Sequence, residues 1–122
     1  MSKELKVLIC DDSVLVRKQM KNILSGQGIN SIEEAVDGEQ AVVKYAECMP
    51  DLVFMDIVMP KKTGVEALKD IKSLNPDAKV VMASSIGTQS NLKEAIENGA
   101  YDFIQKPVSE EIIVKILEKI KD

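Results

Sequence analysis

The sequence contains no histidine and no tryptophan, and its only aromatic side chains are two tyrosines and two phenylalanines. Without histidine, the chain cannot supply a histidine base, a histidine metal ligand or a phosphohistidine of its own. Aromatic residues make up 3% of the chain and apolar residues 45%, so we expect a mainly aliphatic core. Any chemistry in this chain must therefore come from other side chains.

Cysteines and long apolar runs are also scarce. The two cysteines, Cys10 and Cys48, form no paired-cysteine motif, so we expect no disulfide and a reducing environment. No apolar run approaches the roughly 20 residues of a membrane-spanning helix. The charged start, MSKELK, leads directly into an apolar run and does not resemble a signal peptide. We therefore predict a cytoplasmic protein that does not insert into a membrane.

Length and charge narrow the class of protein further. The 122 residues predict a single domain, 1–122, large enough to bury a sizeable core. The formal net charge of −4 argues against direct binding to nucleic acid, whose phosphates attract basic proteins. We expect a monomer that works with protein partners.

Five short apolar runs alternate with amphipathic stretches that have helical spacing. The last amphipathic stretch is the clearest, because Ser109 can cap it and the isoleucines and leucine within 112–120 recur on one helical face. Thr63 with Glu66 predicts a capping box ahead of the third helix. The apolar runs, which we interpret as strands, are Leu5–Cys10, Ser31–Val36, Leu52–Met55, Lys79–Ala83 and Tyr101–Gln105.

This alternation predicts an α/β fold with right-handed crossovers, one parallel sheet and helices on both of its faces. The runs VLIC, LVFM and VVMA are continuously apolar, as central strands should be. SIEEAV and YDFIQ include polar residues, as strands at the edges of a sheet can. We therefore predict five helices around a doubly wound, flavodoxin-like sheet of strand order 2-1-3-4-5.

The predicted strands end in polar groups. Asp11 and Asp12 follow the first strand, Asp56 the third, Ser84 the fourth and Lys106 the fifth. In the predicted order these carboxyl ends share one edge of the sheet, where doubly wound proteins bind their ligands. Each residue alone has an ordinary explanation, such as a helix cap for Asp11 or a solvated surface position for Lys106. Their joint occurrence at four strand ends predicts a functional site.

Three carboxylates at one place repel one another, and one lysine cannot offset that repulsion. A hard divalent cation with oxygen ligands would do so, which predicts a site for Mg²⁺, with Mn²⁺ as an alternative. A metal beside Asp56, Ser84 and Lys106 would suit a phosphoryl group. Asp56 would be the in-line nucleophile, while Ser84 and Lys106 would bind the phosphoryl oxygens.

With these residues in place, the whole chain resembles the response-regulator receiver domains of two-component signalling. The resemblance implies that Asp56 accepts a phosphoryl group from a phosphohistidine of a histidine kinase. It also implies that Asp11, Asp12, Asp56 and the backbone carbonyl of Val58 hold Mg²⁺. A receiver catalyses only its own phosphorylation and dephosphorylation and is not otherwise an enzyme. The matching stretches are LICDDS, LVFMDIVMP, VVMASS and YDFIQKP.

The same resemblance implies a conformational switch. Ser84 would be the switch hydroxyl, Lys106 the phosphate-binding lysine and Phe103 the switch aromatic, a position where tyrosine is common. Phosphorylation would draw Ser84 inward, Phe103 would fill the vacated space, and the surface of helix 4, strand 5 and helix 5 would bind a downstream target. The Lys106–Pro107 peptide bond would be cis.

Within the family, the stretch ASSIGTQSNLKEAIENGAYDFIQKP is similar to the stand-alone chemotaxis response regulators. That similarity implies a flagellar switch as the downstream target. The chain ends soon after the predicted fifth helix, which also fits a stand-alone receiver. A receiver domain cut from a longer regulator, with a DNA-binding or enzymatic output domain, remains an alternative.

The residues two positions beyond the acceptor and the switch hydroxyl flank the path of hydrolytic water in receiver domains. Here they are Val58 and Ile86, which are β-branched, apolar and unable to orient water. We therefore predict slow self-dephosphorylation and the use of a separate phosphatase.

Two other classes of protein share parts of this pattern. A haloacid-dehalogenase-type phosphatase uses an aspartate nucleophile with Mg²⁺, but it needs a second aspartate two positions on, where this chain has Val58. A flavodoxin-like FMN carrier needs a hydroxyl-rich phosphate loop after the first strand, where Asp11 and Asp12 would repel the phosphate. Turnover of a small phosphate ester would favour the phosphatase, and a colourless protein would exclude the FMN carrier.

Overall fold

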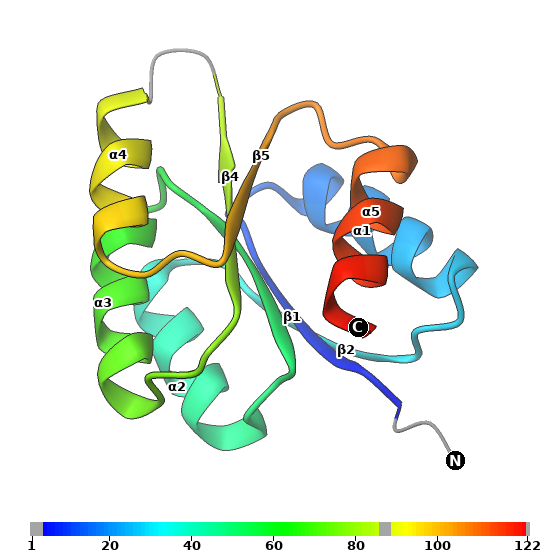
Figure 1. The fold of residues 1–122 in the computed structure, drawn as a ribbon, viewed down its shortest axis with the longest axis horizontal. Helices are drawn as coiled ribbons and strands as arrows, with labels where there is room; N and C mark the ends of the chain where they lie inside the picture. Colours follow the sequence, from blue (N-terminus) through cyan, green and yellow to red (C-terminus); the bar gives the residue numbers. More distant parts are fainter. Residues whose placement is uncertain (1–3, 86–88, 122) are drawn as a thin grey trace.

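The computed structural model describes residues 4–85 and 89–121, and within these ranges five strands alternate with five helices (Figure 1). The strands are β1 (Lys6–Cys10), β2 (Ser31–Ala35), β3 (Leu52–Asp56), β4 (Val80–Ser84) and β5 (Asp102–Gln105). The helices are α1 (Val14–Gly26), α2 (Gly38–Cys48), α3 (Gly64–Leu74), α4 (Gln89–Glu97) and α5 (Glu110–Lys121). Among the described residues, no helix has the length and apolar character needed to cross a membrane.

The strands form one parallel sheet of order β2-β1-β3-β4-β5, which confirms the predicted fold class and strand order. Every residue of β3 and β4 is buried, whereas β2 and β5 are largely half-buried or exposed. The polarity of the five runs therefore identified the central and edge strands correctly, because only central strands are covered on both faces.

The helices cover the sheet in two layers. Figure 1 shows α1 and α5 on one face and α2, α3 and α4 on the other. Two aliphatic cores result, one on each face, and Leu8, Val53 and Met82 belong to the first while Ile9, Phe54 and Val81 belong to the second. Side chains alternate between the faces along each strand, so a continuously apolar strand supplies both cores.

Side-chain caps fix where the helices begin. The Ser13 hydroxyl accepts a hydrogen bond from the Val16 backbone N–H at 3.2 Å, so Ser13 caps α1 and neither preceding aspartate does. Thr63 and Glu66 form the predicted capping box of α3. The Ser109 hydroxyl accepts a hydrogen bond from the Ile112 backbone N–H at 3.2 Å, as predicted for the last helix. Asp11 and Asp12 are therefore left for another role.

Candidate functional site at the carboxyl edge of the sheet

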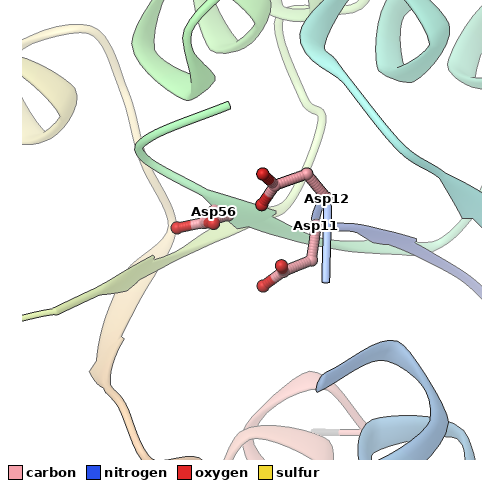
Figure 2. A group of neighbouring side chains, drawn as sticks. All are labelled: Asp11, Asp12 and Asp56. Atoms are coloured by element: carbon pink, nitrogen blue, oxygen red, sulfur yellow. The ribbon is translucent and has the colours of Figure 1, made fainter. Parts of the chain in front are cut away.

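Three carboxylates meet where β1 and β3 end (Figure 2). The strands are adjacent, with Cys10 opposite Met55, so the residues that follow them lie side by side. The three residues Asp11, Asp12 and Asp56 each contribute one carboxylate oxygen. These three oxygens lie within 4.8 Å of one another. Asp11 and Asp56 are buried, with 2% and 8% of their surface exposed, while Asp12 is exposed. The structure thus brings together the three acids predicted from the sequence.

Lys106 reaches this cluster from the end of β5. Its backbone N–H donates to the Ser84 carbonyl at 2.8 Å, which continues the β4–β5 pairing up to the site. Its Nζ donates to Asp11 Oδ2 at 2.7 Å and lies 3.2 Å from Asp56 Oδ2. One ammonium group faces three carboxylates, so the cluster keeps an excess of negative charge.

This crowding changes the acidity of the groups. Burial raises the pKa of the Asp56 carboxyl, and the nearby Asp11 charge raises it further. The Lys106 charge and hydrogen bonds from Lys106 and the Val58 backbone N–H oppose this rise without cancelling it. Burial lowers the pKa of Lys106, but the hydrogen bond to Asp11 and the two acidic charges outweigh burial and raise it. Lys106 therefore stays positively charged at neutral pH.

The three acids fit a hard cation. They offer carboxylate oxygens from two adjacent strand ends, and one of the three residues is open to solvent. Such cations prefer oxygen donors, and Mg²⁺ typically uses one or two carboxylates together with water. A bound cation would offset the negative charge that Lys106 leaves uncompensated.

Ser84 lies at the end of β4 and is buried, and its hydroxyl donates a long hydrogen bond of 3.5 Å to the Ile104 carbonyl on β5. Phe103 lies on β5 opposite Met82, and 47% of its surface is exposed. The hydroxyl and the aromatic ring thus occupy neighbouring strands, one inside the fold and one at its surface. The Lys106–Pro107 peptide bond is cis, as the family resemblance implied.

The structure describes one of the two residues predicted to flank hydrolytic water. Val58 follows β3 and is 61% exposed, and its backbone N–H donates to the Asp56 carboxylate. Ile86 lies outside the described residues. An exposed valine beside Asp56 adds apolar surface at the edge of the acidic cluster.

A groove of about 480 Å³ adjoins the site on the α1 side. It opens beside Lys106, and Val16, Met20, Ile23 and Val108 make much of its wall apolar. The remaining residues that line it are Gln19, Ser85 and Pro107. The polar cluster therefore borders an apolar surface.

Two residues near the cluster were not identified from the sequence. The Gly64 backbone N–H donates to the Ile57 carbonyl at 2.8 Å, and a Cβ at Gly64 would lie 2.0 Å from the Asp56 carbonyl oxygen. The Arg17 side chain is only 11% exposed, and its Nη1 donates to the Asp11 carbonyl at 2.7 Å. The capping box next to Gly64 marks the start of α3 but gives no sign of this close approach.

Known proteins resemble this chain along most of its length. The response regulator receiver domain family matches residues 7–118. The chemotaxis protein CheY of Thermotoga maritima is 42% identical over 115 residues, which cover 94% of this chain and 96% of that protein. A chain in the crystal structure of the CheX–CheY–BeF3–Mg²⁺ complex from Borrelia burgdorferi has a TM-score of 0.89 at 36% identity, with 97% of this chain and 90% of that chain covered.

A further relative is much longer than this chain. The protein-glutamate methylesterase/protein-glutamine glutaminase of Caldanaerobacter subterraneus is 43% identical over 110 residues. These residues cover 88% of this chain but 30% of that protein. Domains similar to this chain thus occur within larger proteins as well as in proteins of its own length.

Proposed function

Because this chain belongs to the response regulator receiver domain family, we propose that it is a phosphorylation-dependent signalling switch of the CheY type whose phospho-acceptor is Asp56. The observation that carries the proposal is the position of the Asp56 carboxylate. It ends a central strand, lies 3.2 Å from the Lys106 ammonium and belongs to a cluster of three acids. A nucleophilic carboxylate beside a fixed positive charge suits transfer of an anionic phosphoryl group.

Asp11, Asp12 and Asp56 would hold Mg²⁺, or Mn²⁺, together with the backbone carbonyl of Val58. When bound, the cation supplies positive charge that stabilises the phosphoryl oxygens as charge builds up on them. The protein contributes the oxygen donors and a partly buried site in which charges interact strongly. This assignment agrees with the excess negative charge of the cluster.

The reaction itself is an in-line displacement at phosphorus. An Asp56 carboxylate oxygen attacks the phosphorus, the new P–O bond forms, and the P–N bond to a histidine of the partner kinase breaks. The leaving histidine nitrogen keeps the electron pair of that bond. Lys106 neutralises the transferred oxygens, and water later attacks the acyl phosphate to release inorganic phosphate and restore the Asp56 carboxylate.

The switch would use Ser84 and Phe103, which lie on the neighbouring strands β4 and β5. Ser84 would exchange its long hydrogen bond with the Ile104 carbonyl for one to the phosphoryl group. Phe103, half exposed in this structure, would move into the space that Ser84 leaves. The surface of α4, β5 and α5 would then bind a target protein, a flagellar switch if the pathway is chemotaxis.

A second candidate is a receiver domain that works within a longer regulator. It is supported by the similarity to one part of the Caldanaerobacter methylesterase/glutaminase. The chemistry at Asp56 would be the same, and only the output would differ.

Labelling with acetyl phosphate tests the proposal. Incubation with Mg²⁺ should add one base-labile phosphoryl group per chain, and omission of Mg²⁺ should prevent labelling. Continuous turnover of a small phosphate ester would instead favour a phosphatase.

A further inference from the structure

The turn after β1 is held by bonds to all of the polar groups of Asp11. The Asp11 backbone N–H donates to the Ala35 carbonyl at 3.1 Å, and Oδ1 accepts from the Ser13 N–H at 2.9 Å. Oδ2 accepts from Lys106 Nζ at 2.7 Å. The remaining group, the carbonyl oxygen, accepts from Arg17 Nη1 at 2.7 Å. This last bond connects α1 to the peptide group between Asp11 and Asp12.

Arg17 also binds a third element, strand β2. Its Nε donates to Glu34 Oε1 on β2 at 3.0 Å, and only 11% of its side chain is exposed. Lys21 Nζ also donates to Glu34, at a distance of 3.2 Å from Oε2, but 45% of the Lys21 side chain is exposed. The guanidinium group thus spans α1, β2 and the Asp11 carbonyl, whereas Lys21, among the described residues, pairs with Glu34 alone.

We propose that Arg17 is a positioning residue for the metal-binding acids. By holding the Asp11 carbonyl against β2, it fixes the turn from which the Asp11 and Asp12 carboxylates extend. This inference rests on the proposed function, because it concerns the affinity of the Asp11–Asp12–Asp56 cluster for a divalent cation. Partners that orient metal ligands without touching the metal commonly change metal affinity by about 10–100-fold when they are removed.

The geometry explains why lysine is not equivalent to arginine at position 17. The guanidinium presents several donors in a rigid plane, so one group can serve the Asp11 carbonyl and Glu34 together. A single ammonium on a flexible stem keeps the positive charge but does not reproduce this fixed fork. Arg17→Lys therefore separates positioning from a general electrostatic effect of the charge.

The test is a calorimetric titration of the metal-free full chain with MgCl₂ at constant ionic strength. The proteins are the wild type, Arg17→Ala, Arg17→Lys and the matched control Lys21→Ala, which loses a contact to Glu34 but none to Asp11. We expect the Mg²⁺ dissociation constant to rise roughly 10-fold in both Arg17 variants. The exposed Lys21 pair is worth little, so Lys21→Ala should stay close to the wild type.

A second readout separates positioning from loss of folding. Circular dichroism should show folded protein at the titration temperature for Arg17→Lys, the variant that decides the question if Arg17→Ala unfolds. At saturating Mg²⁺, labelling of Arg17→Lys by acetyl phosphate should recover to near the wild-type rate, because only metal affinity is impaired.

The outcomes are distinguishable. Wild-type affinity in folded Arg17→Lys, or a loss in Lys21→Ala as large as that in Arg17→Lys, would overturn the positioning role. A wild-type protein that does not bind Mg²⁺ would instead overturn the proposed function.

Discussion

A Cβ at Gly64 would lie 2.0 Å from the carbonyl oxygen of Asp56, although real Cβ atoms essentially never come closer than 3.0 Å to such an atom. The start of α3 therefore packs directly on the end of β3, and the Gly64 N–H donates to the next carbonyl, that of Ile57, at 2.8 Å. Backbone atoms cannot move aside as the end of a flexible side chain can. The absence of a side chain at position 64 is thus a condition for the local path of the chain at Asp56, the proposed acceptor.

We expect Gly64→Ala to destabilise the protein by about 2–3 kcal/mol, because an added methyl group in a filled space forces the backbone apart. The same shift should slow the labelling of Asp56. Urea unfolding gives the stability change, and the rate of labelling by acetyl phosphate gives the change in reactivity.

Gly26 provides the matched control, because it lies at the end of α1 and a Cβ there would meet no atom within 4 Å. Gly26→Ala should stabilise the protein by about 0.5–1 kcal/mol, since alanine has less freedom to lose on folding. Equal stability changes in the two variants would contradict the steric explanation.

A second prediction concerns the charges of the acidic cluster. Asp12→Ala should abolish most of the stabilisation by Mg²⁺, because it removes one of three carboxylates. It should also stabilise the metal-free protein, by about 1 kcal/mol, because Asp11 and Asp56 then lose a like-charged neighbour. Melting temperatures measured with and without Mg²⁺ report both effects.

Lys106→Ala is the comparison for this prediction. It removes the ammonium group that contacts both Asp11 and Asp56, so the metal-free protein should be less stable while Mg²⁺ still binds. The charge explanation would be wrong if Lys106→Ala lost the response to Mg²⁺ and Asp12→Ala kept it.

Much of this architecture is predictable from the sequence, for reasons that particular residues make clear. The continuous apolar runs LVFM and VVMA identify strands covered on both faces, and that identification sets the order of the sheet. Once the order is known, Asp56 must end beside the turn that contains Asp11. Parallel strands carry their terminal residues to a common edge whatever the details of the helices.

The features that were not predicted depend on distances that no pattern along the chain encodes. Arg17 falls within a helical stretch, where an arginine is ordinarily a solvated surface residue, and its bonds to Asp11 and Glu34 need the actual packing of α1 on β2. Gly64 follows a capping threonine and could have been any first-turn residue. Only the close approach of the β3 end excludes a side chain there.

The lowered pKa of Glu34 predicts how the stability of the folded protein depends on pH. Burial acts to raise the pKa of its carboxyl, but hydrogen bonds and charges from Lys21 and Arg17 outweigh burial and lower the pKa. Because the folded pKa lies below the unfolded value of about 4.3, the folded state favours the ionised form. The resulting stability is present above the unfolded pKa and is lost as the pH falls through the folded pKa.

The comparison of wild type with Glu34→Gln measures this contribution. At neutral pH the wild type should be more stable by about 0.5–1 kcal/mol, a small value because 35% of the Glu34 side chain is exposed. The difference should shrink as the pH falls below about 4, and high salt should also reduce it. A difference that grows toward low pH would contradict the sign derived from the ion pairs.

A further prediction concerns the lifetime of the phosphorylated state. Val58 and Ile86 cannot orient water, so self-dephosphorylation should be slow and should call for a separate phosphatase. Val58→Asn/Ile86→Glu should speed the decay of the phosphorylated protein by about 10-fold or more at saturating Mg²⁺, since orientation of a nucleophile has large effects. Val58→Asn alone isolates the exposed residue beside Asp56. Unchanged decay in the double variant would place the limit on hydrolysis elsewhere, at Lys106 or the metal.

The most direct test of the central claim is to locate the phosphoryl group within the chain. After labelling by acetyl phosphate and Mg²⁺, borohydride reduces an aspartyl phosphate to homoserine, and peptide mass spectrometry identifies the position. We expect homoserine at position 56 in the wild type and no base-labile label in Asp56→Asn. Homoserine at another position in the wild type, or wild-type labelling of Asp56→Asn, would contradict the assignment of Asp56 as the phospho-acceptor.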